Sequence, residues 1–358
     1  MTRIHQVLGS SAPFDAVTTQ AFAYRDALGS EGGVYAAEIA RSGVPGVKLL
    51  DALPADGEGL LIVHYTGYVP GMRVLLEHPA RKLLVYHNIT PARYFWNLEP
   101  YVATICQLGR DALPEWVAAA DVAAAVSRFN ADELEAVGAI DPAVVPILVD
   151  PARLEPDARS SSVPEGRPLV LCVGRLSPHK RHDLVLRAFA RYQRMHAPGA
   201  TLLCVGFALD RQYLRRLERV AAEEGARGVA FVEQLPQGEL NRAYREADAV
   251  LSMSEHEGFC VPLLEAFHFG VPVVARRAGA MPEVGGDAVL WLEQDDGVEV
   301  AAELLDLAVT DEPLRAELRR RGRAQVEAMS LERARAALRS AVDRALGERA
   351  PAYSRNAE

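Results

Sequence analysis

The sequence SEHEGFCVPLLEA, residues 254–266, stands between a strand-like run and a helical pattern. Residues 249–253 are mostly apolar and form a run short enough for a buried strand. Pro262 suits a first helical turn, and Gly270 followed by Pro272 marks a helix end. A loop at a helix start offers backbone N–H groups and the positive end of the helix dipole to an anion. The segment therefore predicts a strand, an anion-binding loop and a helix.

Two carboxylates flank this loop eight positions apart. Glu257 lies in the loop and Glu265 in the first turns of the helix. Carboxylate oxygens accept hydrogen bonds from hydroxyls. The loop is therefore suited to a ligand that carries both phosphate and sugar hydroxyls.

Outward from this segment, short apolar runs alternate with helical patterns along most of the chain. The expected strands are 4–8, 34–37, 60–65, 82–86, 169–173, 201–205, 229–232, 249–253, 271–275 and 288–291. Such alternation predicts an α/β fold with parallel sheets that carry helices on both faces. Ligands in such sheets bind beyond the carboxyl ends of the strands, so two facing sheets predict a cleft between them.

The 358 residues are enough for two domains. Residues 155–168 are rich in Pro, Ser, Asp and Gly, which is typical of a linker. We therefore expect one domain over 1–160 and a second over 161–330. A helix at about 331–346 is expected to pack back on the first domain, and the polar tail after Gly347 is expected to be disordered.

The composition limits the classes of function. A net charge of −9 argues against nucleic acid as the main partner. The four cysteines lack zinc or CxxC spacing, which favours free thiols in a reducing cytoplasm. The N-terminus does not resemble a signal peptide, and no run of about 20 apolar residues is present. We expect a cytoplasmic protein, and peripheral contact with the inner face of a membrane stays open.

A second loop carries two cations. The sequence GRLSPHKR, residues 174–181, follows one expected strand and precedes a helix. Arg175 and Lys180 would suit a diphosphate, Arg as a planar fork and Lys as a point charge. The alternative is a solvated basic loop.

These two segments resemble the donor loops of retaining glycosyltransferases of family 4, of the type that builds bacterial cell-surface polysaccharides. The E-x7-E pattern of Glu257 and Glu265 and the G-R-x4-K pattern of Gly174, Arg175 and Lys180 carry the resemblance. It implies the GT-B fold, in which two Rossmann-like domains face a central cleft.

The resemblance also implies roles for single residues. Arg175 and Lys180 would contact the donor pyrophosphate and stabilise the leaving group, Glu257 would hold a sugar hydroxyl, and Glu265 would hold the ribose hydroxyls. Further donor contacts are expected at Gly9, Gly174, Gly258, Phe259, Cys260 and Val261. The family commonly has Gly where this chain has Cys260, which we interpret as a spacer and not a nucleophile.

In the first half, the segment YHNITP, residues 86–91, resembles the histidine loop of the family's acceptor domain. His87 would then face the donor sugar and could donate to a hydroxyl, although a satisfied core histidine is the alternative. Residues expected to contact donor or acceptor are Ser10, Asn88, Ser127 and Arg128. For Ser127 and Arg128, a helix N-cap with a surface arginine is an equal alternative.

The function implied is transfer of a hexose from a UDP- or GDP-linked sugar to a glycan or lipid-linked acceptor, with retention and with phosphate assistance on the same face. No metal site and no cofactor beyond the nucleotide sugar are expected, since Asp295-Asp296 fits a turn and not a DxD motif. The alternatives are a nucleotide-sugar epimerase of the same architecture and a non-catalytic nucleotide-sugar binding protein. A dehydrogenase is disfavoured because no G-x-G-x-x-G follows the first strand.

Overall fold

The computed structural model describes residues 2–13, 15–155 and 164–347, and it divides into two compact units. Unit 1 is Met1–Leu148 with Leu331–Glu358, and unit 2 is Val149–Ser330. Most of the predicted linker, including the predicted boundary at residue 160, and the tail after Gly347 lie outside the described residues.

The structure places the boundary between the units earlier than residue 160. The short 3-10 helix η4 (Pro151–Leu154) already belongs to unit 2. Asn241, which is fully buried, donates from Nδ2 to the carbonyl oxygens of Arg153 and Glu155 at 2.7 and 2.9 Å. These hydrogen bonds fix η4 to helix α6 (Gln237–Glu246), a link that composition alone does not reveal.

Unit 1 contains a parallel sheet of order β3-β2-β1-β4-β5-β6-β7. Its strands are β1 Ile4–Ser11, β2 Val34–Ile39, β3 Val47–Leu49, β4 Leu60–Tyr65, β5 Arg81–Tyr86, β6 Val122–Ala125 and β7 Ala143–Val144. The central strands β4 and β5 are almost entirely buried, as expected for parallel strands covered on both faces.

The helices of unit 1 vary from single turns to twenty residues. They are α1 Ala16–Leu28, η1 Leu50–Ala52, η2 Pro70–Leu75, η3 Ala92–Tyr94, α2 Pro100–Ala119, α3 Arg128–Ala136 and α11 Leu331–Leu346. Asp15 caps α1 by accepting from the N–H of Thr18 at 2.7 Å.

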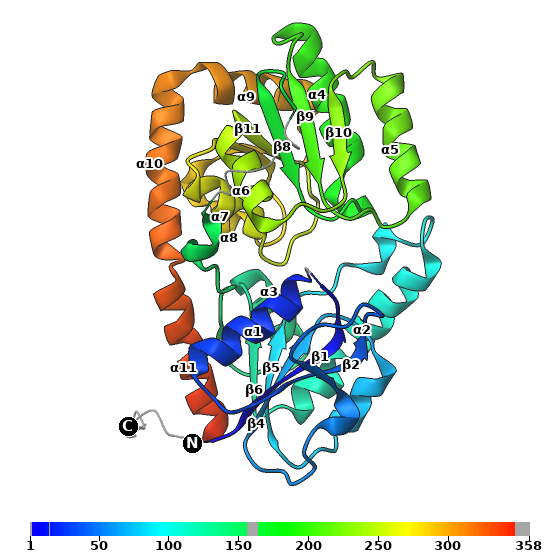
Figure 1. The fold of residues 1–358 in the computed structure, drawn as a ribbon, viewed down its shortest axis with the longest axis vertical. Helices are drawn as coiled ribbons and strands as arrows, with labels where there is room; N and C mark the ends of the chain where they lie inside the picture. Colours follow the sequence, from blue (N-terminus) through cyan, green and yellow to red (C-terminus); the bar gives the residue numbers. More distant parts are fainter. Residues whose placement is uncertain (1, 14, 156–163, 348–358) are drawn as a thin grey trace, which may run out of the picture. The chain divides into compact units, whose positions relative to one another are not determined.

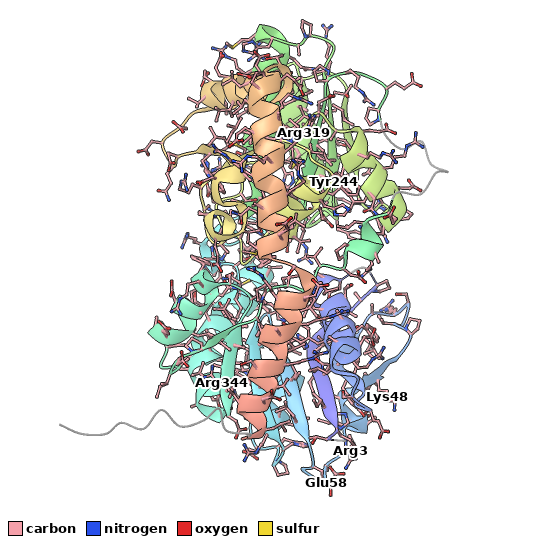
Figure 2. All side chains as sticks on the ribbon, turned by 90° about the vertical axis from the view of Figure 1, so that its left-hand side faces the viewer. Arg3, Lys48, Glu58, Tyr244, Arg319 and Arg344 are labelled. Carbon is pink, nitrogen blue, oxygen red and sulfur yellow. The ribbon has the colours of Figure 1, made fainter. Side chains whose placement is uncertain are left out.

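Helix α11, red in Figure 1, packs against β5, β6 and α1 although it follows unit 2 in the chain. The guanidinium of Arg81 donates to the carbonyl of Ala345 at 3.0 Å. Arg344, labelled in Figure 2, donates to the carbonyl of Asp141 at 2.9 Å. These long-range contacts join the last helix to the first sheet.

Unit 2 contains a second parallel sheet, of order β10-β9-β8-β11-β12-β13. Its strands are β8 Leu169–Val173, β9 Thr201–Val205, β10 Val229–Val232, β11 Ala249–Ser252, β12 Val273–Arg276 and β13 Val289–Leu292. Figure 1 shows β8, β9 and β10 side by side. The strand order reverses between β8 and β11, and ligands bind at such a switch point in open parallel sheets.

The helices of unit 2 connect these strands and close the chain. They are η5 Pro178–Lys180, α4 His182–Met195, α5 Arg211–Glu223, α6, α7 Val261–His268, α8 Met281–Gly285, η6 Gly286–Ala288, α9 Val298–Thr310 and α10 Glu312–Ala328. Helix α9 packs on α4 and helix α10 on α7. The α7 start and its Gly270 terminus were both predicted.

Candidate functional site

Two loops leave the carboxyl ends of β8 and β11, the two strands that flank the switch point of unit 2. The first loop runs over residues 174–181 and the second over 253–260. The N–H of Glu255 donates to the carbonyl of His179 at 2.8 Å, which joins one loop to the other. The topology thus brings together the two segments that the sequence singled out.

The first loop folds tightly around a lysine. Gly174 has φ +145°, and a Cβ at this position would lie 3.4 Å from Nζ of Lys180. The 3-10 helix η5 then turns the chain, so that Lys180 points back toward the end of β8. Gly174 therefore has a local reason to be glycine, because it adopts a backbone conformation that other residues avoid.

Lys180 and Glu257 form the central ion pair of this site. Nζ of Lys180 lies 2.6 Å from Oε1 of Glu257, and their side chains are only 17% and 9% exposed. Burial lowers the pKa of Lys180, but the adjacent Glu257 carboxylate more than offsets it, so the net pKa lies above the ordinary value. The pair is charged, and a phosphate at this place would compete with Glu257 for the ammonium.

Arg175 lies in the same loop as Lys180, five residues earlier, and its side chain is exposed. Within the described part of the chain, its guanidinium makes no hydrogen bond or ion pair. All its N–H donors are therefore available to a ligand, as a diphosphate contact requires.

A second ion network fixes the two loops, and the sequence did not reveal it. Arg181 pairs with Asp183 at 2.9 Å and also with Glu255, and Arg276 lies 3.6 Å from the same Glu255 carboxylate. Arg181 itself has φ +51°. Because Glu255 and Arg181 belong to different loops, this network fixes the position of Lys180 relative to Glu257.

The position of Glu257 is also fixed through its backbone. The N–H of Ala280 donates to the carbonyl of Glu257 at 2.9 Å. Gly279 has φ +55°, and a Cβ there would lie 2.3 Å from that carbonyl oxygen. Gly279 is therefore a position where no other residue fits without displacing Glu257.

The second loop ends at the N-terminus of α7. Cys260 precedes the helix with φ +77°, and its thiol is buried, which raises its pKa well above the ordinary value. In the described residues, no backbone carbonyl accepts from the N–H groups of Phe259, Cys260 or Val261. A raised thiol pKa disfavours a nucleophile, and the three N–H groups at a helix start suit an anion.

Helix α7 ends as predicted. Gly270 has φ +69°, the N–H of Val271 donates to the carbonyl of Ala266 at 2.9 Å, and the N–H of Gly270 donates to the carbonyl of Phe267 at 3.1 Å. This is the Schellman arrangement, which satisfies the last carbonyls of a helix.

Glu265 is held by a tyrosine from the neighbouring helix α6. Oη of Tyr244 donates to Oε2 of Glu265 at 2.8 Å, and the Tyr244 ring stacks on Phe269 with centroids 5.8 Å apart. Burial raises the pKa of Glu265, and the hydrogen bond from Tyr244 opposes this shift. Tyr244 thus fixes one carboxylate oxygen and leaves the other for a ligand.

In unit 1, His87 follows β5 and pairs with a second buried histidine. Nε2 of His87 lies 2.8 Å from Nδ1 of His64, and Nε2 of His64 lies 2.9 Å from Oε1 of Gln6. The two imidazole rings stack with centroids 5.1 Å apart. Burial lowers the pKa of His87 to about 4 and that of His64 well below its ordinary value. Both rings are therefore neutral near pH 7.

The residue after His87 anchors the loop. Asn88 has φ +79°, and its Nδ2 donates to Oδ1 of Asn130 at 2.9 Å and to Glu133 at 3.2 Å. Glu133 also accepts from Oη of Tyr86 at 2.8 Å and pairs with Arg110 at 2.6 Å. This network holds the loop that presents His87.

The structure corrects the expected setting of Gly9 and Ser10. The first strand was predicted to end at residue 8, but β1 continues to Ser11 because Ser10 and Ser11 pair with Glu38 and Ile39 of β2. A Cβ at Gly9 would lie 2.8 Å from Cγ2 of Val69, so close packing inside unit 1 explains this glycine. Ser10 lies within the strand and is exposed.

Ser127 and Arg128 occupy the positions of a helix start. Oγ of Ser127 accepts from the N–H of Asn130 at 3.2 Å and caps α3. Arg128 is half exposed and pairs with Asp132 at 2.7 Å and Glu135 at 2.5 Å. These contacts correspond to the N-cap alternative that the sequence left open.

His64, Gln6 and Tyr244 are the site neighbours that the sequence analysis missed. His64 and Gln6 interrupt the apolar runs of two adjacent buried strands. A buried polar residue in each of two neighbouring strands is a signal that could have found them. Tyr244 carries no such signal, because its contact with Glu265 depends on how α6 packs.

No cluster of three or more His, Cys, Asp or Glu side chains in the described residues is arranged to hold a metal ion. No described helix is long and apolar enough to cross a membrane.

The chain is similar to known glycosyltransferases. Residues 155–325 match the family model "Glycosyl transferases group 1". A GDP-mannose-dependent alpha-(1-6)-phosphatidylinositol monomannoside mannosyltransferase of Mycolicibacterium smegmatis is 32% identical over 206 residues, 52% of this chain and 50% of that protein. O-antigen chain mannosyltransferase B of Escherichia coli is 30% identical over 163 residues, 45% of this chain and 42% of that protein. The matched part thus spans half or less of these curated relatives.

Solved structures extend the likeness to the whole fold. The Anabaena protein Alr3699/HepE, in complex with UDP and glucose, has a TM-score of 0.76 at 16% identity, covering 96% of this chain and 100% of that one. WaaG, a glycosyltransferase involved in lipopolysaccharide biosynthesis, has a TM-score of 0.69 at 17% identity, covering 95% of this chain and 98% of that one. Residues 155–325 are therefore similar to the glycosyl transferases of group 1, and the chain has the GT-B fold of two Rossmann-like domains.

Proposed function

We propose that this protein is a retaining glycosyltransferase that moves a hexose from a nucleotide diphosphate sugar to a glycan or lipid-linked acceptor. The observation that carries the proposal is the charged Lys180–Glu257 pair, which lies at the switch point of a group 1 domain. The free N–H groups at the start of α7 lie in the same loop as Glu257. A cation and a helix N-terminus suit the diphosphate, and the carboxylate suits a sugar hydroxyl.

Mannose is the first sugar to test. Several relatives are described as mannosyltransferases, and three of them are described as GDP-mannose-dependent. We therefore propose GDP-mannose as the donor, with UDP-sugars as the next candidates. A lipid-linked acceptor would bring the enzyme to a membrane surface by peripheral contact.

The chemistry assigned to the donor loops is stabilisation of the leaving nucleoside diphosphate. As the bond between sugar C1 and the phosphate oxygen breaks, negative charge develops on that oxygen. Lys180, Arg175 and the N–H groups of residues 259–261 would bind this charge, and Glu265 would hold the ribose. The acceptor oxygen forms the new bond to C1 on the same face, and its proton passes to the departing phosphate.

The neutral His87 would bind a hydroxyl in this scheme. Its pKa of about 4 keeps it uncharged at neutral pH, so it exchanges ordinary hydrogen bonds and does not compete for the diphosphate. No protein metal is required in this proposal, because the cations of the chain neutralise the leaving group.

A panel of nucleotide sugars tests the proposal. A donor at a hundredfold excess over its Kd should stabilise the protein by about 2.7 kcal/mol and raise Tm by about 5 °C. The stabilising donor is then incubated with glycan and lipid-linked acceptors, and the anomeric configuration of the product is determined by NMR. A product with inverted configuration would contradict retention, and an epimerised nucleotide sugar formed without acceptor would contradict transfer.

A further inference from the structure

A second concentration of positive charge lies in unit 2, away from the donor loops. A cavity of about 430 Å³ is lined by parts of α6, α7 and α10 and by the segment that leads into β12. Four arginines line it, namely Arg245, Arg315, Arg319 and Arg323. We call this cavity the arginine pocket. Its other lining residues include His268 and the rings of Phe267 and Phe269, and none is acidic.

The position of the pocket on α7 separates it from the proposed donor site. The donor loop meets the N-terminus of α7, whereas the pocket is lined by the C-terminal residues Phe267 and His268. Eight helical residues span about 12 Å. The two places therefore lie at opposite ends of one helix.

Two of the four arginines are held firmly by helix ends. Nε of Arg319, labelled in Figure 2, donates to the carbonyl of Gly270 at 3.1 Å, and Nη1 of Arg315 donates to the carbonyls of Ala308 and Val309 at 2.8 and 2.9 Å. These bonds cover the C-terminal carbonyls of α7 and α9, whose dipoles would repel an anion. The bonds also leave the positive charge of each guanidinium in place.

The other two arginines have no partner within the described chain. Arg245 and Arg323 are exposed and make no hydrogen bond or ion pair there. The only carboxylate within 4 Å of the pocket arginines in the described residues is Glu312, which lies 3.3 Å from Arg315 and 3.2 Å from Arg319. The pocket therefore keeps a local excess of positive charge in a chain whose net charge is −9.

Three of the four pocket arginines lie on one helix, α10. Arg315, Arg319 and Arg323 are spaced four residues apart and so occupy one face of the helix. Like charges at this spacing repel each other. The neighbouring Arg320 and Arg321 both pair with Glu317 at 2.7 Å, whereas Arg323 has no such carboxylate partner among the described residues.

We propose that the arginine pocket binds a small soluble phosphate-bearing anion, such as a pyrophosphate or a phosphate monoester. Guanidinium groups recognise phosphate oxygens through paired N–H donors. The volume of about 430 Å³ is of the size that holds a small molecule. This site is independent of the proposed glycosyl transfer.

Inorganic pyrophosphate is the probe, and Kd is measured by calorimetry on the full chain. The Arg245→Gln/Arg323→Gln variant removes the two unpartnered cations and should bind pyrophosphate about tenfold more weakly or worse. The matched control, Arg320→Gln/Arg321→Gln, has the same change in net charge, lies on α10 beside Arg323 and should bind like the wild type. Arg245→Lys/Arg323→Lys, which keeps the charge, should recover part of the affinity.

The Lys180→Gln variant separates the pocket from the donor loops. Pyrophosphate binding that persists in Lys180→Gln and is lost when Arg245→Gln/Arg323→Gln is added to that variant supports the pocket, whether or not transfer is detected. Binding lost in Lys180→Gln alone, or weakened equally in both arginine double variants, overturns it. Pocket-dependent binding to phosphatidylglycerol vesicles without pyrophosphate binding would overturn the assignment to a soluble anion.

Discussion

The polar groups that we single out in unit 1 and in unit 2 differ in charge and in the hydrogen-bonding groups that they offer to a ligand. In unit 1, Gln6, His64 and His87 form a neutral chain of hydrogen bonds. In unit 2, the buried pair is charged, and free backbone N–H groups lie in the same loop. Two similar sheets thus carry different chemistry: the first suits a hydroxyl and the second a phosphate.

The largest expected effect comes from removing the cation of unit 2. Lys180→Gln leaves Glu257 buried without its partner and removes the charge that meets the leaving phosphate. We expect kcat/KM for sugar transfer to fall roughly 10²–10³-fold. Steady-state kinetics with the best donor measure this.

Lys48 offers the matched control. It is exposed in unit 1, as Figure 2 shows, and Lys48→Gln should transfer sugar at the wild-type rate. If Lys180→Gln also retains nearly full turnover, the charged pair has no part in catalysis.

The next effect concerns the neutral histidines of unit 1. An unfolded histidine binds a proton below pH 6.5, whereas folded His87 does so only below about 4. Between these values the unfolded state holds more protons, so stability falls as pH falls from 6.5 to 4. The loss attributable to His87 is up to about 3 kcal/mol. Urea unfolding at a series of pH values measures it.

A variant tests whether His87 causes this slope. His87→Gln should flatten the loss of stability in that window, whereas His268→Gln, at an exposed position, should leave it unchanged. An equal dependence of stability on pH in the wild type and in His87→Gln would show that His87 does not cause the loss.

A smaller effect tests how Glu265 is held. Tyr244→Phe removes the hydrogen bond to Oε2 of Glu265 and should weaken binding of a nucleoside diphosphate about tenfold. The 2′,3′-dideoxy analogue, which lacks the ribose hydroxyls, should bind both proteins alike. Calorimetry with the two nucleotides measures the difference.

Tyr192 provides the control for this comparison. It is fully buried in the same unit, and its hydroxyl has no hydrogen-bond partner in the described structure. Tyr192→Phe should not change nucleotide affinity. A loss of affinity for the dideoxy analogue in Tyr244→Phe would mean that the tyrosine supports the loop and not the ribose contact.

The smallest effect is expected at Cys260. Its φ of +77° is unfavourable for a side chain, and glycine would adopt it freely. Cys260→Gly should change stability by no more than about 1 kcal/mol and activity by less than about twofold. A hundredfold loss of transfer would instead give the thiol a chemical role.

The sequence alone singled out residues 174–181 and 254–266 because their signals are local. Lys180 and Glu257 lie 77 residues apart, yet each follows a strand that flanks the switch point, so the fold brings them together. The start of the helix at Pro262 and its end at Gly270 could likewise be predicted from the residues at those positions. The glycosyltransferase resemblance and the GT-B fold are confirmed by the comparisons.

The features that were missed depend on contacts between distant segments. β1 is longer than predicted because β2 extends the pairing to Ser11. Unit 2 begins before the predicted boundary at residue 160, and Asn241 of the same unit binds η4 and the residue after it. The bond from Tyr244 to Glu265 depends on helix packing, which residue spacing does not encode. The roles assigned to the site residues stay predictions.

Calorimetry of GDP against GMP, with UDP and UMP in parallel, tests the central claim most directly. If the loops of unit 2 hold a diphosphate through Lys180, the diphosphate of the preferred base should bind about 30-fold more tightly than its monophosphate. That preference should largely disappear in Lys180→Gln. Equal affinities in the wild type, or a preference that survives the substitution, would contradict a diphosphate site at this pair.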